Sequence, residues 1–135
     1  MQKPSANPNR QSTGQAGEQV AANFLQNKGY AILAMNFKNN TGRRIGEIDI
    51  IARDTQEQEI VFVEVKTRDY ISYSQTLPEE NINYQKLRKL AKIAAVFLRQ
   101  KHWEDAPHRF DAISVWLDWK TRRAKIKHLP SIYLS

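Results

Sequence analysis

Two neighbouring segments constrain the fold of this chain most: IGEIDIIAR, residues 45–53, and IVFVEVKTR, residues 60–68. Both are rich in Ile, Val and Phe, and a short polar run containing DTQEQ separates them, which is the pattern of two strands joined by a turn. Apolar residues occupy both alternating positions, as in strands covered on both faces of a sheet. Each segment nevertheless carries charged residues, and burial of a charge is costly. The pair therefore predicts a core hairpin whose charged side chains need an explanation.

Alternation along the two strands places these charged side chains together, because successive side chains point to opposite faces. One face of the first strand presents Ile45, Glu47, Asp49 and Ile51. The other face presents Ile48 and Ile50. One face of the second strand presents Ile60, Phe62, Glu64 and Lys66. Directly opposed residues of an antiparallel pair share a face, so a register with Ile51 opposite Phe62 places Asp49 opposite Glu64. Glu47 then lies opposite Lys66, and a register slip by two residues would make these side chains diagonal neighbours on the same face. In either register we expect three carboxylates and one ammonium group at one end of the hairpin.

The remaining segments predict the other elements of the fold. A helix that begins near Thr13 precedes a strand over residues 30–37. After the hairpin, residues 83–101 repeat apolar side chains at helical spacing, and residues 109–117 are the next predicted strand. A strand, helix, strand order implies a right-handed crossover with parallel pairing, and residues 124–129 return as an edge strand. The order αβββαβ with a trailing strand predicts an α/β fold with a central mixed sheet flanked by helices.

Length and composition limit the kinds of site that the chain can hold. A chain of 135 residues has room for one domain, expected over residues 13–135, and the Pro, Asn, Ser and Gln content of residues 1–12 predicts a disordered lead-in. Without cysteine there are no disulfides, thiolate metal sites or cysteine nucleophiles. The three histidines lack metal-ligand spacing and are expected to be ordinary surface or rim residues, and Asp111 is expected to make structural hydrogen bonds. No apolar run of about 18 residues occurs, so we expect a cytoplasmic protein without a membrane span.

Positive charge is concentrated in the second half of the sequence. Residues 1–80 hold 9 Lys or Arg against 10 Asp or Glu, whereas residues 81–135 hold 12 against 4, which gives balances of −1 and +8 and the net charge of +7. A polyanionic partner is therefore expected, and the candidate nucleic-acid contacts are Arg43, Arg44, Arg68, Lys86, Arg88 and Lys89. Contacts to phosphate carry no sequence information, so we expect DNA to be recognised by structure.

The predicted carboxylate cluster is suited to a divalent metal ion. Like charges on adjacent strands raise at least one pKa and destabilise the fold unless a cation compensates, and Lys66 alone cannot balance three carboxylates. Oxygen ligands favour a hard ion such as Mg²⁺, and Mn²⁺ accepts the same ligands. Such an ion can bind a scissile phosphodiester and lower the pKa of a water. The simpler alternative, in which the charged strand ends are only solvated, stays open at this point.

The role expected of Lys66 depends on that ion. Neighbouring carboxylates raise the pKa of an ammonium group above its usual value of about 10.4, so Lys66 is expected to be a counter-ion in the metal-free protein. When an ion neutralises Asp49 and Glu64, Lys66 becomes suited to orient an attacking water and to stabilise the phosphate, with a lowered pKa.

Several segments, taken together, resemble a known family. GEIDIIARD is followed by IVFVEVKTR, with GQAGEQVAANFLQNKGYAILAMNF before them and RFDAISVW and IKHLPSIY after them. This order and spacing closely resemble the YraN-like family of small uncharacterised bacterial proteins, from about Thr13 to Tyr133. That family resembles the restriction-endonuclease-like nuclease superfamily and is similar in outline to archaeal Holliday junction resolvases. The resemblance implies a restriction-endonuclease-like αβββαβ core and a metal-dependent endonuclease that acts on branched or otherwise structured DNA.

Position by position, the resemblance also implies a set of site residues. Asp49, Glu64 and Lys66 are implied as the catalytic residues. Asp49 and Glu64 are implied as Mg²⁺ ligands, together with the backbone carbonyl of Val65. Glu18 stands where resolvase-like members carry a helix glutamate that completes the site, and a solvated helix acid is the alternative for it.

Glu47 and Lys86 keep two interpretations each. Glu47 belongs to the family motif, and it either binds metal or forms a salt bridge with Lys66 or Arg68. Lys86 matches a basic position of the family, and it is either a phosphate contact or an ordinary exposed helix lysine.

Three hypotheses describe what the protein does. The first is a Mg²⁺-dependent nuclease. The second is a non-catalytic module that binds nucleic acid or a partner protein on a nuclease fold, and the third is a fold whose acidic cluster is purely structural. A homodimer is compatible with the first hypothesis, because junction-cleaving enzymes act at paired strands.

Overall fold

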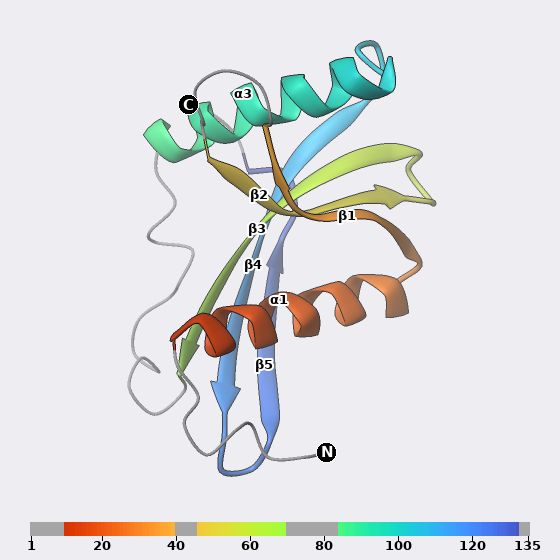
Figure 1. Cartoon of the computed structure of the whole chain (residues 1–135). Helices are drawn as coiled ribbons and strands as arrows, with labels where there is room; N and C mark the ends of the chain where they lie inside the picture. The colour runs from red at the N-terminus through yellow and green to blue at the C-terminus, as the bar shows by residue number, and fades with distance from the viewer. Residues whose placement is uncertain (1–9, 40–45, 70–83, 133–135) are drawn as a thin grey trace.

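The computed structural model describes residues 10–39, 46–69 and 84–132 of the chain. Helix α1 (Arg10–Asn27) precedes three strands, β1 (Tyr30–Lys38), β2 (Glu47–Asp54) and β3 (Glu59–Asp69). Helix α3 (Tyr84–Lys101) then leads to β4 (His108–Asp118) and β5 (Arg123–Leu129). The α/β class and the order αβββαβ with a trailing strand are confirmed (Figure 1). Helix α1 begins three residues before the expected start at Thr13.

The five strands form one mixed sheet in the order β1-β2-β3-β4-β5. Strands β1 and β2, β2 and β3, and β4 and β5 pair antiparallel, whereas β3 and β4 pair parallel through the crossover that contains α3. Ile51 lies opposite Phe62, so the predicted register of the hairpin is confirmed. The pairing of β2 with β3 ends at Ile50 opposite Val63, so the charged residues beyond this pair lie where the two strands separate.

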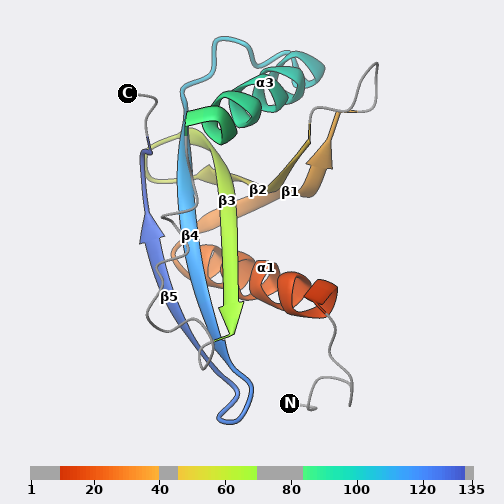
Figure 2. The same cartoon turned by 90° about the vertical axis from the view of Figure 1, so that its left-hand side faces the viewer.

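The two helices cover opposite faces of the sheet. In Figures 1 and 2, α3 lies above the β1–β2 part of the sheet and α1 lies below it. The core on the α1 side contains Ala21, Ala22, Leu25, Ile50, Ala52, Val61, Val63, Val65, Ile113, Val115 and Leu117. The core on the α3 side contains Ile48, Ile51, Ile60, Phe62, Leu90, Ile93, Ala94, Phe97 and Leu98. The apolar residues of both alternating positions are thus buried, which is why the strands read as almost continuous hydrophobic runs.

Alternation fails at one point of β2. Ile50 packs on the α1 side and Ile51 on the α3 side, as alternation requires, but Ile48 also packs on the α3 side. The expectation that Ile48 and Ile50 share a face is therefore wrong. The physical reason lies at Asp49, whose carboxylate accepts a hydrogen bond from the backbone N–H of Val65 at 2.8 Å. Asp49 points along the sheet towards β3, and the strand changes its facing there.

A second group of charged side chains lies at the other end of β2 and β4. Arg109 donates to Asp111 at 3.0 Å, to Asp54 at 3.1 Å and to Glu59 at 2.8 Å. Asp111 is fully buried and also bonds His128 Nε2 at 2.8 Å. The structural role expected of Asp111 is confirmed. His128 is not the ordinary surface or rim residue that was expected, because its side chain is only 7% exposed and bonds the buried Asp111.

Candidate metal centre

The centre lies where β2 separates from β3. Pairing of these strands runs from Asp54 opposite Glu59 to Ile50 opposite Val63. Beyond that pair, the Asp49 carboxylate accepts the hydrogen bond of the Val65 N–H. The N–H and C=O of one strand residue point to the same side of the strand, so the Val65 carbonyl also faces this fork. The two strands therefore open into a gap that a carboxylate and a backbone carbonyl border.

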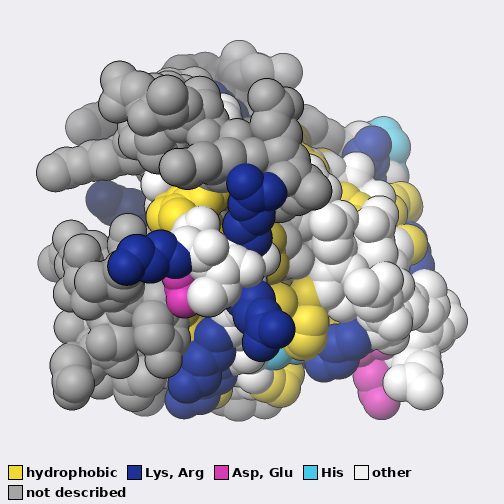
Figure 3. Space-filling view, turned by 90° about the horizontal axis from the view of Figure 1, so that it is seen from below, with side chains coloured by type: hydrophobic (Ala, Val, Ile, Leu, Met, Phe, Trp, Pro, Cys, Tyr) yellow, Lys and Arg dark blue, Asp and Glu magenta, His cyan; other side chains and the backbone are white. Residues whose placement is uncertain are grey.

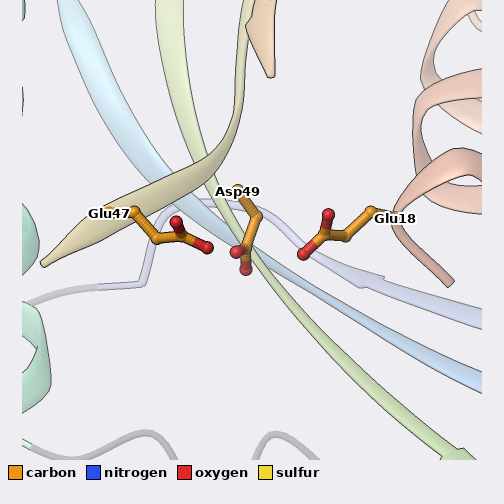
Figure 4. A group of neighbouring side chains, drawn as sticks. All are labelled: Glu18, Glu47 and Asp49. Carbon is orange, nitrogen blue, oxygen red and sulfur yellow. The ribbon is translucent and has the colours of Figure 1, made fainter. Parts of the chain in front are cut away.

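Three carboxylates meet at the fork. One oxygen from each of Glu18, Glu47 and Asp49 lies within 4.8 Å of the other two (Figure 4). Glu47 and Asp49 come from β2, and Glu18 reaches them from α1 on the other side of the gap. The structure thus places Glu18 beside Asp49, as the resemblance implied. Glu47 forms an ion pair at 3.6 Å with Lys38, its partner on β1, and not the expected one with Lys66 or Arg68.

Close packing of α1 on β3 brings Glu18 into position. Gly17 precedes it in α1 and is buried against Thr67, and a Cβ atom at position 17 would overlap the Thr67 side chain. Asn36 of β1 donates a hydrogen bond from Nδ2 to Glu18 Oε1 at 2.9 Å. The sequence interpretation missed Asn36, although it is the one amide side chain in the otherwise mainly apolar run YAILAMNF.

Glu64 lies beside Asp49, but lysines bind its carboxylate. It is 3% exposed, and its side chain is hydrogen bonded to that of Asp49. Its Oε2 atom lies 3.7 Å from Lys66 Nζ and 2.5 Å from Lys86 Nζ. Among the described residues, the group of three carboxylates does not include Glu64. Lys86 is therefore a component of the centre, and its interpretation as an ordinary exposed helix lysine is wrong.

Burial and repulsion disturb the protonation of Asp49. Burial raises its pKa to about 9, and the hydrogen bond and the negative charge of Glu64 act in the same direction. The N–H of Val65 lowers this pKa and the charge of Glu18 raises it, but both effects are smaller. In the metal-free protein, this raised pKa favours the protonated form of Asp49 at neutral pH. A cation at the fork would displace that proton.

The two lysines have opposite pKa shifts. Burial lowers the pKa of Lys66, and the hydrogen bond with Lys86 lowers it further, although the charge of Glu64 opposes both effects. The expectation of a raised pKa for Lys66 without metal is therefore wrong, since it took no account of burial, the largest effect, or of a second ammonium group. Burial also lowers the pKa of Lys86, but the hydrogen bonds with Glu64 and Lys66 outweigh burial and the net shift is upward. Lys66 is thus the lysine that loses its proton more easily.

An open pocket of about 530 Å³ gives access to the centre. Its lining combines the fork with the first turns of α3: Gly46, Glu47, Asp49, Glu64, Val65, Lys66, Gln85, Lys86, Lys89, Leu90 and Ile93. A pocket of this size can accept part of a nucleotide. Carboxylates, a carbonyl and three lysines line it, so it offers both cation ligands and anion contacts.

The predicted nucleic-acid contacts are distributed unevenly around this pocket. Lys86 and Lys89 line it. Arg88 lies over the ring of Tyr84 at 5.7 Å. Arg68 donates to its neighbour's backbone carbonyl at 3.0 Å and is partly buried. Arg43 and Arg44 lie outside the described residues, so their prediction is not tested.

Membrane insertion finds no support in the helices. Within residues 10–39, 46–69 and 84–132, neither helix is both long and apolar enough to span a bilayer.

Comparison with known proteins identifies the family. The model of "Uncharacterised protein family UPF0102" matches residues 17–115. A UPF0102 protein of Caldanaerobacter subterraneus is 40% identical over 122 residues, which cover 90% of this chain and 93% of that protein. Corresponding proteins of Pelobacter propionicus and Caldicellulosiruptor bescii are 38% and 39% identical, covering 95% and 87% of this chain and 86% and 93% of their own. The YraN-like family is this same uncharacterised family. The chain therefore belongs to the UPF0102 family.

Proposed function

We propose that this protein is a metal-dependent endonuclease that hydrolyses phosphodiester bonds in DNA, with Mg²⁺ or Mn²⁺ as its ion. The observation that carries the proposal is the convergence of Glu18, Glu47 and Asp49 at the fork, beside Glu64 and a lysine of lowered pKa. A structural cluster would need only to balance its charges, whereas this one holds a buried carboxyl of raised pKa beside two other carboxylates and opens into a pocket.

The residues at the fork suit a hard divalent ion. Every donor is an oxygen atom, and burial together with Glu64 raises the pKa of Asp49, a penalty that a bound cation would offset. Asp49, Glu18 and Glu47 would hold the ion on one side, with Glu64 and the Val65 carbonyl on the β3 side. A bound divalent ion supplies charge neutralisation at the scissile phosphate and a water of lowered pKa.

The lysines would divide the remaining tasks between them. Lys66 lies 3.7 Å from Glu64, which fixes its amine next to the carboxylates. Its lowered pKa makes Lys66 a suitable acceptor for the proton of the attacking water. Lys86 keeps its charge more firmly and lines the pocket with Lys89, so these two ammonium groups would contact the phosphate.

Positive charge supports DNA as the partner. The net charge is +7, and in the view from below Lys and Arg side chains are widespread on the described surface while acidic ones are few (Figure 3). Contacts from such side chains are to phosphate, so binding should weaken steeply with salt and should depend on DNA structure. Cleavage of a branched substrate acts on paired strands, which a homodimer would serve.

One observation favours a second candidate, a non-catalytic module that binds DNA or a protein partner. Lys66 and Lys86 already balance the carboxylate of Glu64 without any ion. If these pairs persist when a ligand binds, Glu64 is not available to an ion and the pocket serves only for binding.

Thermal melts and cleavage assays separate the two candidates. The protein, Asp49→Asn and Lys66→Ala are melted with and without millimolar Mg²⁺ or Mn²⁺, and then assayed on branched, duplex and single-stranded DNA. For the nuclease, the ion raises the melting temperature of the wild type and leaves that of Asp49→Asn unchanged. Lys66→Ala then lowers the cleavage rate at least about 100-fold while DNA binding changes little. Lys92→Ala is the control for the loss of one lysine charge, because Lys92 is an exposed lysine of helix α3.

The opposite result is equally clear. If the ion leaves every melting temperature unchanged and no DNA is cut, but all variants still bind DNA, the binding module is correct. A cleavage activity that survives Lys66→Ala unchanged would also contradict the proposed role of that lysine.

A further inference from the structure

Asn36 occupies a specific position next to the metal centre. On β1, Met35 lies opposite Ile50 and Phe37 lies opposite Ile48, so Asn36 is level with Asp49 on the neighbouring strand. Its backbone has a φ of 52°, which is the left-handed region. Asparagine is one of the few residues other than glycine that adopt this region readily. The strand therefore bends at Asn36, beside the place where β2 changes its facing.

The bend directs the Asn36 side chain towards α1. Ala34 and Phe37 both pack on the α3 side, although they are three residues apart, so the left-handed residue has shifted the alternation between them. The amide of Asn36 meets Glu18 of α1, with Nδ2 donating to Oε1 at 2.9 Å. A regular strand would place this side chain elsewhere.

We propose that Asn36 is a positioning residue that holds the carboxylate of Glu18 towards the fork. This inference rests on the proposed metal-dependent function. A glutamate side chain loses conformational entropy when it is fixed in one position. The hydrogen bond from Asn36 fixes it before an ion arrives, so that cost does not reduce the affinity for the ion.

The chemistry of an amide suits this task better than that of an ammonium group. Lys38 and Lys86 show how a lysine would bind a carboxylate here, since each neutralises its partner and competes with a cation for it. A neutral amide donor restrains one oxygen of Glu18 and leaves its negative charge in place. The other oxygen stays available to an ion, so Asn36 orients the ligand and does not compete with the ion.

The substitution Asn36→Gly tests the inference, because glycine keeps the left-handed backbone without strain and removes only the amide. We measure the dissociation constants of Mn²⁺ and Mg²⁺ by calorimetry for the wild type, Asn36→Gly, Glu18→Gln and the double variant. We expect Asn36→Gly to weaken binding of the ion about 10-fold. In the Glu18→Gln background, the same change should have no further effect. Gln58→Gly is the control, because Gln58 also has a left-handed φ of 57° but lies in the turn between β2 and β3.

The outcomes distinguish this inference from the proposed function. If the wild type binds no ion, the metal-dependent function fails, and the inference fails with it. If the wild type binds the ion and Asn36→Gly binds it equally well, only the role of Asn36 is overturned. An equal loss in both backgrounds would also overturn it, because Asn36 would then act on the fold and not through Glu18.

A second pair of variants tests the contact without any ion. Asn36→Asp places a carboxylate against Glu18, and we expect a lower melting temperature in the metal-free protein. Adding Glu18→Gln restores a donor and an acceptor with their roles exchanged, and the melting temperature should recover. Absence of recovery would overturn the contact between these two positions.

Discussion

Gly17 of α1 lies directly against Thr67 of β3, with no room between them for a side chain at position 17. A Cβ atom there would lie 2.7 Å from the Thr67 Cβ, which is attached to the strand backbone and cannot move away by a change of rotamer. The contact fixes how closely α1 approaches the sheet. It therefore also fixes how far Glu18, the next residue, reaches into the fork.

Gly17→Ala is accordingly expected to destabilise the protein by about 1–3 kcal/mol, because an overpacked contact forces the helix to shift. It should also weaken the response of the melting temperature to Mn²⁺, since Glu18 moves with the helix. Gly14→Ala is the matched control, because Gly14 lies in the same helix and a Cβ there meets no atom within 4 Å. Alanine at that position should stabilise by up to about 1 kcal/mol. Urea denaturation checks both values, and equal effects at the two positions would contradict the packing argument.

The raised pKa of Asp49 predicts how stability changes with pH in the metal-free protein. Burial and Glu64 raise this pKa to about 9, from an unfolded-state value near 4. Between those values the native state binds more protons than the unfolded state, so the free energy of unfolding falls as pH rises, by at most about 1.4 kcal/mol per pH unit. Asp49→Asn should remove this slope, because the amide can accept from Val65 and donate to Glu64 without titrating.

Urea denaturation in the presence of a chelator, at about pH 5 and about pH 8, measures the two slopes. The free energy of unfolding of Asp49→Asn should therefore increase relative to that of the wild type as pH rises. Saturating Mg²⁺ should reverse the order, because only the wild type keeps the ligand. Parallel slopes for the two proteins would show that Asp49 ionises normally in the folded state.

Local patterns in the sequence were sufficient to predict the hairpin. The register with Ile51 opposite Phe62 follows from alternation and the length of the turn, and both depend on residues close together in the chain. The parallel pairing of β3 with β4 follows from the intervening helix. These parts of the fold were predictable because strand alternation, the length of the turn and the right-handed crossover leave few alternatives.

The fork itself was not predictable, because it breaks the rule on which the prediction relied. Alternation predicts that Ile48 and Ile51 face opposite sides of the sheet, whereas both pack on the α3 side. Nothing in the residues of β2 alone shows that Asp49 takes the hydrogen bond of Val65 in place of a backbone carbonyl. The left-handed backbone of Asn36 on the next strand accompanies this change, and its effect appears only once the strands are assembled.

The pKa of Lys66 was predicted in the wrong direction for a similar reason. The sequence interpretation weighed Lys66 against the carboxylates of its own hairpin, which raise its pKa, and left out burial, which lowers it most. Lys86 comes from a helix 20 residues further along the chain, and its contact with Glu64 adds a second cation at the same point. Long-range contacts between elements decide the electrostatics of such a site, and composition or spacing does not record them.

Lys86 should stabilise the metal-free protein through Glu64. Lys86→Met removes the nearer of the two ammonium groups from a carboxylate that is 3% exposed, so we expect a loss of about 1–3 kcal/mol. Mg²⁺ should restore part of this loss, since an ion at the fork balances the same charge. Lys89→Met is the control, because Lys89 is an exposed residue of the same pocket wall and should change stability by less than about 0.5 kcal/mol. A loss that Mg²⁺ leaves unchanged would show that Lys86 and the ion act at separate places.

Arg109 should contribute more to stability than any residue of the metal centre. It donates to Asp54, Glu59 and Asp111, and Asp111 is fully buried. Burial alone would raise the pKa of Asp111, but hydrogen bonds from His128, Arg109 and the Ser131 N–H outweigh it and the net shift is downward. Arg109→Met would leave the buried carboxylate of Asp111 without its arginine partner, which typically costs about 3–5 kcal/mol.

The pH dependence of this loss distinguishes an electrostatic cause from a packing defect. In the wild type the pKa of Asp111 is lowered, so its stabilising contribution is present above the unfolded-state pKa of about 4 and is lost as pH falls through the lower, folded-state value. The stability difference between wild type and Arg109→Met should therefore be large at neutral pH and narrow towards about pH 3. Arg99→Met, at an exposed arginine near the end of α3, should show a small and constant difference. A difference for Arg109→Met that does not change with pH would mean that the arginine stabilises the fold through the packing of its methylene groups and not through its charge.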